Sequence, residues 1–366
     1  MKRRSPVGAI AGILGAAALL VGCQTGPALS DDAVDPRVYS ACQDADGAAA
    51  WERARAALAR KDDAASLPDL LTCIDRCPDL VRAHLAYQDV AIRLGGETQR
   101  AMQARYLGAP EGRSPVAAYL RARLAETSYA QSNALDAILA RDPSFAWAHL
   151  SRGRVNRRQG RLLQAVDMFA AAIVHDQTLY EAHLERAQVL AELGREAEAA
   201  VDYRAYLRGV PDDMVAARAF VSLLLYRLGR IDEALTLLDE LEKKQPGSLS
   251  LRMDRAAAEW RAKRPRQAVE IYLSVLAEDP RCARAALNIG LLYYEVLPQD
   301  EASRRTYWPK ARAAFQLFLE WVVPSDGHEQ FERTLAVPYR LQVIADLLGP
   351  AARTPALDDL RWPEGA

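Results

Sequence analysis

The sequence predicts an all-α protein built as a solenoid of stacked helix pairs. The chain has 366 residues, which is more than one hydrophobic core usually serves. It is rich in Ala, Leu and Arg and only 7% aromatic, a composition that favours helix. Four alanines, Ala165, Ala199, Ala234 and Ala268, follow one another at intervals of 34, 35 and 34 residues. A period of this length indicates stacked repeats, for which chain length has no ceiling.

The residues around each alanine define a unit of two helices. A small residue lies twelve positions before each alanine, and a large residue lies four positions after it. In three units a Gly lies between the small residue and the alanine, and in three a Pro lies near the end of the unit. These four series are Gly153, Ala187, Ser222 and Ala256; Phe169, Tyr203, Leu238 and Tyr272; Gly160, Gly194 and Gly229; and Pro211, Pro246 and Pro280. Small residues let two helices approach, Gly accepts the positive φ of a tight turn, and Pro ends the second helix. Each pair leaves an apolar face that the next pair must cover.

These residues resemble the tetratricopeptide repeat, whose pattern has small, Ala, aromatic and Pro positions in the same order. A further position that is small in the family pattern departs here, because Tyr206, Leu241 and Val275 are large. The resemblance covers roughly residues 47–324 and implies a right-handed solenoid of about eight helix pairs, three of them degenerate. It also implies that the first helices line a concave face that takes protein or peptide ligands.

Composition and periodicity divide the sequence into six parts. We expect a cleaved signal peptide at 1–22, an acylated Cys and flexible tether at 23–46, degenerate helix pairs at 47–143, a regular array at 144–324 with a loop insertion near 298–307, a capping helix at 325–348 and a loose tail at 349–366. The tether is assigned from Pro, Gly and Asp without helical periodicity. The insertion is assigned because the fifth regular unit is interrupted between its two helices.

The first 23 residues have the pattern of a lipoprotein signal. Three basic residues at positions 2–4 precede the uncharged run Val7–Val21, which is too short to span a membrane but suits the apolar region of a signal peptide. The run ends in Leu20-Val21-Gly22-Cys23, which resembles the lipobox of bacterial lipoproteins. The resemblance implies cleavage before Cys23 and acylation of that residue. An ordinary secretory signal or an uncleaved anchor is the alternative.

The residue after the lipobox and the net charge bear on location and partners. In enteric bacteria an Asp at this position retains a lipoprotein at the inner membrane, so Gln24 resembles an outer-membrane sorting signal. We therefore expect a lipid-anchored protein of the bacterial cell envelope, at the outer membrane and facing the periplasm. The formal net charge of -1 gives no global attraction for nucleic acid. We expect no nucleic-acid partner, and membrane contact through the lipid anchor.

Four cysteines follow the lipobox, at Cys42, Cys73, Cys77 and Cys282. In an oxidising periplasm, a bridge from Cys42 to Cys77 or Cys73 would tie the tether to the first helix pair. Three pairings of the four cysteines are possible, and the sequence does not choose among them. Cys73 also occupies a core position and could be a buried thiol.

Three histidines, His84, His149 and His183, fall at the same position of their units. Units stack roughly 10 Å apart, whereas zinc ligands converge within about 2.1 Å of one ion. We therefore expect a structural role for these histidines, and neither a metal nor another cofactor. The sequence also has no nucleophile elbow, phosphate-binding loop, zinc-protease motif or dinucleotide fingerprint, and we expect that the protein is not an enzyme.

The resemblance places certain first-helix positions in the binding groove. The side chains assigned to it here are Trp147, Arg154, Arg157, Arg158, Gln188, Tyr226, Arg227, Trp260, Arg261, Arg284, Asn288 and Tyr294. They recur at three- and four-residue steps, which places them on one helix face. Arg and aromatic side chains dominate binding energy at interfaces, so we expect a basic, aromatic groove for an acidic peptide, the carboxyl terminus of a partner or an anionic glycan. Alternatively, the aromatics are core residues and the arginines only solvate the surface.

The function favoured by these observations is a membrane-anchored periplasmic adaptor that binds protein partners, with a role in envelope or secretion-complex assembly. The alternative from another class is a scaffold in exopolysaccharide export that contacts an anionic glycan. The peptide-carboxylate clamp of the family needs a Lys and Asn set of which only Asn288 is recognisable, so that mode of binding is not expected. An enzyme is a third and less favoured reading.

Overall fold

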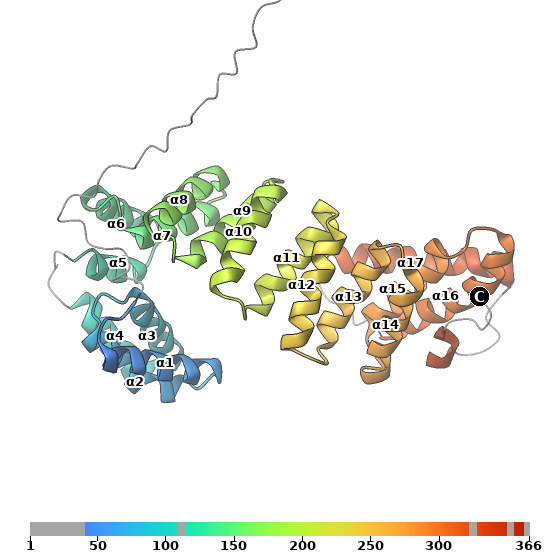
Figure 1. Ribbon diagram of the computed structural model, residues 1–366, viewed down its shortest axis with the longest axis horizontal. Helices are drawn as coiled ribbons and strands as arrows, with labels where there is room; N and C mark the ends of the chain where they lie inside the picture. The colour runs from blue at the N-terminus through green and yellow to red at the C-terminus, as the bar shows by residue number, and fades with distance from the viewer. Residues whose placement is uncertain (1–40, 109–113, 322–327, 350–354, 362–366) are drawn as a thin grey trace, which may run out of the picture. The chain divides into compact units, whose positions relative to one another are not determined.

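A computed structural model of the protein describes residues 41–108, 114–321, 328–349 and 355–361. Within these ranges all regular structure is helical, and the helices follow one another as stacked pairs (Figure 1). This confirms the predicted all-α stack of helix pairs. The signal peptide at 1–22, Cys23 and the tether as far as residue 40 lie outside the described residues.

The described residues contain eight helix pairs, as expected, and the second helix of most pairs contacts the first helix of the next. Three pairs precede residue 144: α1 (Ala45–Ala59) with α2 (Asp63–Arg76), α3 (Val81–Leu94) with α4 (Gly96–Leu107), and α5 (Pro115–Arg123) with α6 (Ser128–Arg141). Five follow: α7 (Ala146–Arg158) with α8 (Leu162–His175), α9 (Tyr180–Glu192) with α10 (Glu196–Gly209), α11 (Met214–Leu223) and η2 (Leu224–Leu228) with α12 (Ile231–Lys244), α13 (Leu249–Arg261) with α14 (Pro265–Glu278), and α15 (Ala283–Leu291) and η3 (Leu292–Val296) with α16 (Glu301–Trp321). The helix α17 (His328–Leu348) and the short 3₁₀ turn η4 (Leu357–Leu360) complete the order.

The periodic alanines and the glycines of the repeat lie where two helices pack closely or where the backbone turns between them. The four periodic alanines are fully buried. A Cβ atom added to Gly153 would lie 2.5 Å from Cε1 of Phe169, so only a Gly allows this ring to sit against the backbone of α7. Gly160 turns the backbone between α7 and α8 with φ of 72°. Lys263 occupies the equivalent turn after α13 with φ of 62°, in a region that side chains other than Gly rarely adopt.

Two first helices end in a π turn that the sequence analysis did not predict. In η2 the N–H of Gly229 bonds to the carbonyl of Leu224, five residues back. The N–H of Leu297 bonds in the same way to Leu292, at 3.1 Å. The unit with the 35-residue interval contains η2, so this turn absorbs one extra residue without unwinding the helix. Such turns recur at functional sites, and both lie on the helices that build the groove described below.

The insertion near 298–307 is not a loop over its whole length. Helix α16 begins at Glu301, so most of the inserted residues lengthen the second helix of the last pair. The added turns place Tyr307 against Tyr293, with ring centroids 5.9 Å apart, and Trp308 against Tyr294, at 5.1 Å. Both pairs are stacked. This aromatic packing against η3 is the physical reason that the segment is helical, and it corrects the expectation of a loop.

The C-terminal part contains more ordered structure than the sequence suggested. Helix α17 occupies the place expected for a capping helix and buries Val337 and Ile344. The segment predicted as a loose tail instead forms η4, in which Leu360 is fully buried. The hydroxyl of Tyr293 donates to the Leu360 carbonyl at 3.0 Å. This bond and the burial of Leu360 dock the turn on η3, so residues 355–361 are not a loose tail.

Cys42 and Cys77 form a disulfide with their Cα atoms 5.6 Å apart, and Cys73 and Cys282 are free thiols. The bond joins the residues before α1 to the end of α2. Helix α1 begins at Ala45, two residues inside the predicted tether, because Asp44 accepts a hydrogen bond from the N–H of Gly47 at 2.8 Å. Burial raises the pKa of the Cys73 thiol to about 11, which suppresses the thiolate that would attack the disulfide.

We expect the disulfide to stabilise the N-terminal helix pairs. The bond spans 35 residues, for which loss of chain entropy in the unfolded state corresponds to about 3–4 kcal/mol. Replacement of Cys42 and Cys77 together by Ser should lower the free energy of unfolding by that amount, measured by urea denaturation. Replacement of Cys282 by Ser is the control. An unchanged denaturation midpoint in the double variant would contradict the expectation.

Candidate binding groove

Trp147 was assigned to the groove but is a core side chain, only 2% exposed. The guanidinium of Arg82, from α3, lies 5.6 Å from the centroid of its ring. Arg82 also donates to the Glu181 carboxylate of α9, from Nε at 3.1 Å and from Nη2 at 2.9 Å. Side chains of α3 and α9 therefore meet over α7 and cover the indole. The assignment of Trp147 to the ligand surface is corrected for this reason.

The arginines predicted on α7 are engaged by neighbouring side chains. Arg154 donates to Glu185 at 2.7 Å. Arg157 donates to Glu185 at 3.2 Å and to the amide oxygen of Gln188 at 2.7 Å, and it also pairs with Glu192. Arg158 donates to Gln131 at 2.9 Å. Because carboxylates of α9 already neutralise Arg154 and Arg157, the predicted basic stripe on α7 is not a free anion-binding surface.

An open groove lies farther along the sequence, over the first helices of the last three pairs and α17. It has a volume of about 1360 Å³. It brings together five of the predicted residues: Tyr226, Trp260, Arg261, Arg284 and Asn288. A smaller adjoining hollow between α11 and α13 shares two of them, Tyr226 and Arg284. This groove is the candidate functional site.

The π turn η2 presents Tyr226 at the groove. Leu224 and Leu225, which precede it, are buried, whereas Tyr226 is 51% exposed. The guanidinium of Arg261, at the end of α13, lies 4.7 Å from the centroid of the Tyr226 ring. A cation at this distance is attracted to the face of the ring. The contact holds an aromatic side chain and a positive charge together at the surface.

The positive charges of the groove are less fully paired than those of α7. No carboxylate partner lies within ion-pair distance of Arg261 or Lys263 among the residues that the structure describes. Arg284 has a 61% exposed side chain and approaches Asp254 only to 3.9 Å. Asp254 also accepts two hydrogen bonds from Arg218, which leaves it little capacity to neutralise Arg284.

Three other predicted residues have structural partners. The amide of Asn288 lines the groove but donates to the hydroxyl of Tyr272 at 3.0 Å. Arg227 donates to Glu196 at 2.7 Å. The ring of Tyr294 is stacked on that of Trp308, and the guanidinium of Arg340 lies 5.8 Å from its centroid. These contacts explain their positions without a ligand.

Several groove residues were missed from the sequence. Phe318 of α16 and Arg340 of α17 line the groove together with Lys263. Arg340 donates to Glu295 at 3.1 Å and so ties α17 to η3. Lys263 could have been found, because it stands where other units have the mid-unit Gly. Nothing in the period indicates that α17 reaches the groove, since that helix belongs to no complete repeat.

The three histidines have separate protein partners. His149 bonds through Nε2 to the carbonyl of Pro143 at 2.8 Å, and its ring is stacked on that of His175, with centroids 5.3 Å apart. Among the described residues, no three His, Cys, Asp or Glu side chains are placed to hold one metal ion. In the same part of the protein, no helix is long and apolar enough to cross a membrane.

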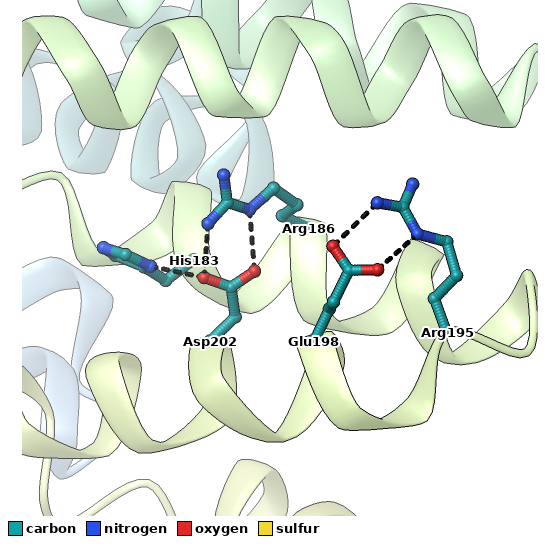
Figure 2. Close-up of polar contacts among 5 residues, drawn as sticks. All are labelled: His183, Arg186, Arg195, Glu198 and Asp202. Carbon is teal, nitrogen blue, oxygen red and sulfur yellow. Dashed lines mark hydrogen bonds and ion pairs between the residues drawn. The ribbon is translucent and has the colours of Figure 1, made fainter. Parts of the chain in front are cut away.

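His183 belongs to a polar cluster around the buried carboxylate of Asp202, between α9 and α10. Figure 2 shows His183 and Arg186 pointing at Asp202, with the Arg195–Glu198 pair beside them. Asp202 accepts from Nδ1 of His183 at 2.7 Å and from Nε and Nη2 of Arg186 at 2.7 and 2.8 Å. Burial by itself would raise the pKa of Asp202, but these donors outweigh it and lower the pKa. The cluster locks the two helices of one pair together.

His84 links α3 to α4 in the N-terminal part. Its Nδ1 is 2.7 Å from the Tyr106 hydroxyl and its Nε2 is 2.9 Å from the Pro78 carbonyl. A carbonyl only accepts, so Nε2 carries the proton and Nδ1 accepts from Tyr106. Burial lowers the pKa of His84 to about 4, and the hydrogen bond to Pro78 only partly opposes this. His84 is therefore neutral in the folded protein.

Three segments of the sequence, residues 121–178, 222–273 and 253–296, match the sequence model of the tetratricopeptide repeat. The first spans α6 to α8 with the end of α5, and the other two span the helices from the end of α11 to η3. These stretches are therefore tetratricopeptide repeats, and proteins built from this repeat act as protein-interaction scaffolds.

Several solved structures resemble the protein. YrrB, described as a TPR protein with an unusual peptide-binding site, is 14% identical and matches over 57% of this chain and 99% of its own, with a TM-score of 0.43. MamA from Desulfovibrio magneticus is 16% identical over 48% of this chain and 94% of its own, with a TM-score of 0.40. A tetratricopeptide repeat protein from Parabacteroides merdae is 12% identical over 82% and 98%, with a TM-score of 0.37. No curated protein matches this one in sequence.

We expect His84 to make stability depend on pH in the mildly acidic range. Its pKa falls from 6.5 in the unfolded state to about 4 in the fold, so the unfolded state binds more protons between these values. The stability is fully present above pH 6.5 and declines as pH falls towards 4, by about 3 kcal/mol. Urea denaturation at pH 7, 5.5 and 4.5 measures this loss. In His84→Gln the loss over the same range should shrink, and an equal loss would contradict the assignment.

Proposed function

We propose that this protein is a lipid-anchored adaptor of the bacterial cell envelope that holds a protein partner in the groove over α11, α13, α15 and α17. The observation that carries the proposal is the groove itself. Its lining combines apolar side chains with guanidinium groups, and Tyr226 and Arg261 are presented together at its surface. Aromatic and Arg side chains are the residue types that dominate the energy of protein interfaces.

Anchorage is supported by the sequence before the folded part. The run Val7–Val21 and the motif ending in Cys23 resemble a lipoprotein signal, and acyl chains on Cys23 would hold the protein at a membrane. The Cys42–Cys77 disulfide fits an oxidising compartment such as the periplasm. Gln24 supports the outer membrane over the inner membrane. A role in assembling envelope or secretion complexes follows from this location and from the scaffold character of the repeat.

The anchor is tested by changing its cysteine. We expect wild-type protein to incorporate labelled palmitate and to appear as a mature form that begins at acylated Cys23, as found by mass spectrometry. Cys23→Ala should accumulate as unprocessed precursor without label, because the lipid cannot be attached. Cys282→Ala is the matched control and should be processed normally. Normal cleavage of the Cys23 variant, or a wild-type protein without lipid, would rule out the anchor.

The groove is tested by photo-crosslinking in the native envelope. A benzoylphenylalanine in place of Tyr226 should form a discrete adduct with a protein, because this side chain lies exposed at the groove. The control is the same photo-crosslinker in place of Val201, which is exposed on α10 and does not line the groove. We expect the Tyr226 adduct to disappear when Trp260→Ala removes part of the groove wall. Identical adducts from both positions, or an adduct insensitive to Trp260→Ala, would refute the groove as the binding site.

A further inference from the structure

We infer that the groove recognises an acidic segment of a protein, in which carboxylates flank a large apolar side chain. This inference rests on the proposed function and specifies the chemistry of the partner. It follows from three features of the groove: its unpaired or weakly paired cations, the partly exposed apolar side chains that line it with them, and the engagement of the nearby carboxylates by other side chains.

The cations are the first feature. Arg261 and Lys263 stand at the end of α13 and in the turn that follows it, and Arg284 stands on α15. In the described part of the protein the first two have no carboxylate partner, and the third shares an acid that Arg218 already holds. A guanidinium grips a carboxylate through two parallel hydrogen bonds. The three groups therefore offer separate places for negative charge along a bound segment.

The apolar lining is the second feature. Trp260 and Leu291 are partly exposed where they line the groove, whereas the other apolar lining residues Met253, Leu287 and Phe318 are buried. Trp260 is only half-buried, and it directly precedes Arg261 in the sequence. A large apolar side chain of the partner would remove this surface from water, which stabilises binding in proportion to the apolar area buried. Positive charge beside partly exposed apolar side chains selects a partner that is acidic and amphipathic.

The third feature favours a protein segment over an anionic glycan. Sugar hydroxyls need acceptors as well as donors, and Lys and Arg side chains only donate. The nearby carboxylates are already engaged, since Glu295 of the groove binds Arg340 and Asp254 of the adjoining hollow binds Arg218. The Asn288 amide is also engaged, through its bond to Tyr272. The groove therefore offers cations beside apolar surface. These groups bind the carboxylates and apolar side chains of a protein segment better than the hydroxyls of a glycan.

The inference is tested by selection from a random dodecapeptide library displayed on phage, with the mature protein as bait. We expect a consensus in which Asp or Glu flanks Leu, Phe or Trp. The selected peptide, labelled with fluorescein, should bind at least tenfold more tightly, as measured by anisotropy, than its isostere with Asn and Gln in place of the acids. Tenfold corresponds to about 1.4 kcal/mol. Its affinity should fall as salt concentration rises, because exposed charges are screened.

Two triple variants with the same change in charge localise the site. Arg261→Gln, Lys263→Gln and Arg284→Gln together should weaken the selected peptide at least tenfold. Arg154→Gln, Arg157→Gln and Arg158→Gln together should leave its affinity unchanged, because those guanidiniums are already engaged. Circular dichroism melting of both variants identifies any loss of folding, and single Arg261→Gln and Arg284→Gln variants replace a triple that fails to fold.

The outcomes separate this inference from the proposed function. A neutral or basic consensus, or equal weakening by both triple variants, overturns the acidic assignment and leaves the groove as a protein-binding site if the crosslink from Tyr226 is found. Tight binding of oligogalacturonate by wild-type protein without any peptide consensus overturns it in favour of a glycan. Recovery of no consensus at all, with no crosslink from Tyr226, refutes both.

Discussion

The close approach of paired helices at a few small residues is the constraint on which the rest of this structure depends. At Gly153 and again at Gly290 an aromatic ring lies where a Cβ atom would be, with 2.5 Å to Phe169 and to Phe315, respectively. The buried alanines complete the same contact from the second helix. Because these contacts set how closely the helices of a pair pack, they determine which side chains of the first helices reach a shared face. The groove exists only because this packing repeats from pair to pair.

Charge pairing divides that face into two stretches, which differ in whether their cations are already paired with carboxylates. Over α7, arginines form ion pairs with glutamates of the next unit. Arg82 of α3 also pairs with Glu181 of α9 and covers this part of the face. Over α13 and α15, Asp254 and Glu295 are already held by Arg218 and Arg340. The free energy available to a ligand is the difference between its contacts and those it displaces, so an arginine held by carboxylates contributes little. The stretch with unpaired cations is therefore the one that we propose as the binding site.

The sequence predicted the repeated part of the structure well and the unrepeated part poorly. The alanine period and its associated residues predicted about eight helix pairs and the burial of the alanines and of the large side chains that follow them, because these positions have the same environment in every unit. Ser222, one of the small positions, is instead exposed. The sequence also pointed to Tyr226, Trp260 and Arg284, which the structure brings together. The helical insertion, the docked turn η4 and the contribution of α17 occur once each. They depend on contacts such as Trp308 on Tyr294, which no period can indicate. The burial of Trp147 was expected only as an alternative for the same reason, since Arg82, which covers it, comes from α3, two units earlier.

The disulfide at the start of the fold has a mechanical consequence for an anchored protein. A polypeptide held by lipids at Cys23 and by a partner at its groove is under tension whenever the two are pulled apart. Without a crosslink, that tension would peel α1 away from α2, one turn at a time. The bond between Cys42 and Cys77 transmits the force from a residue before α1 directly to the residue after α2, and from there to α3. The helices α1 and α2, which lie between the two cysteines, therefore bear none of it. If the protein is anchored as proposed, it would transmit this force between membrane and partner without unfolding from its N-terminal end.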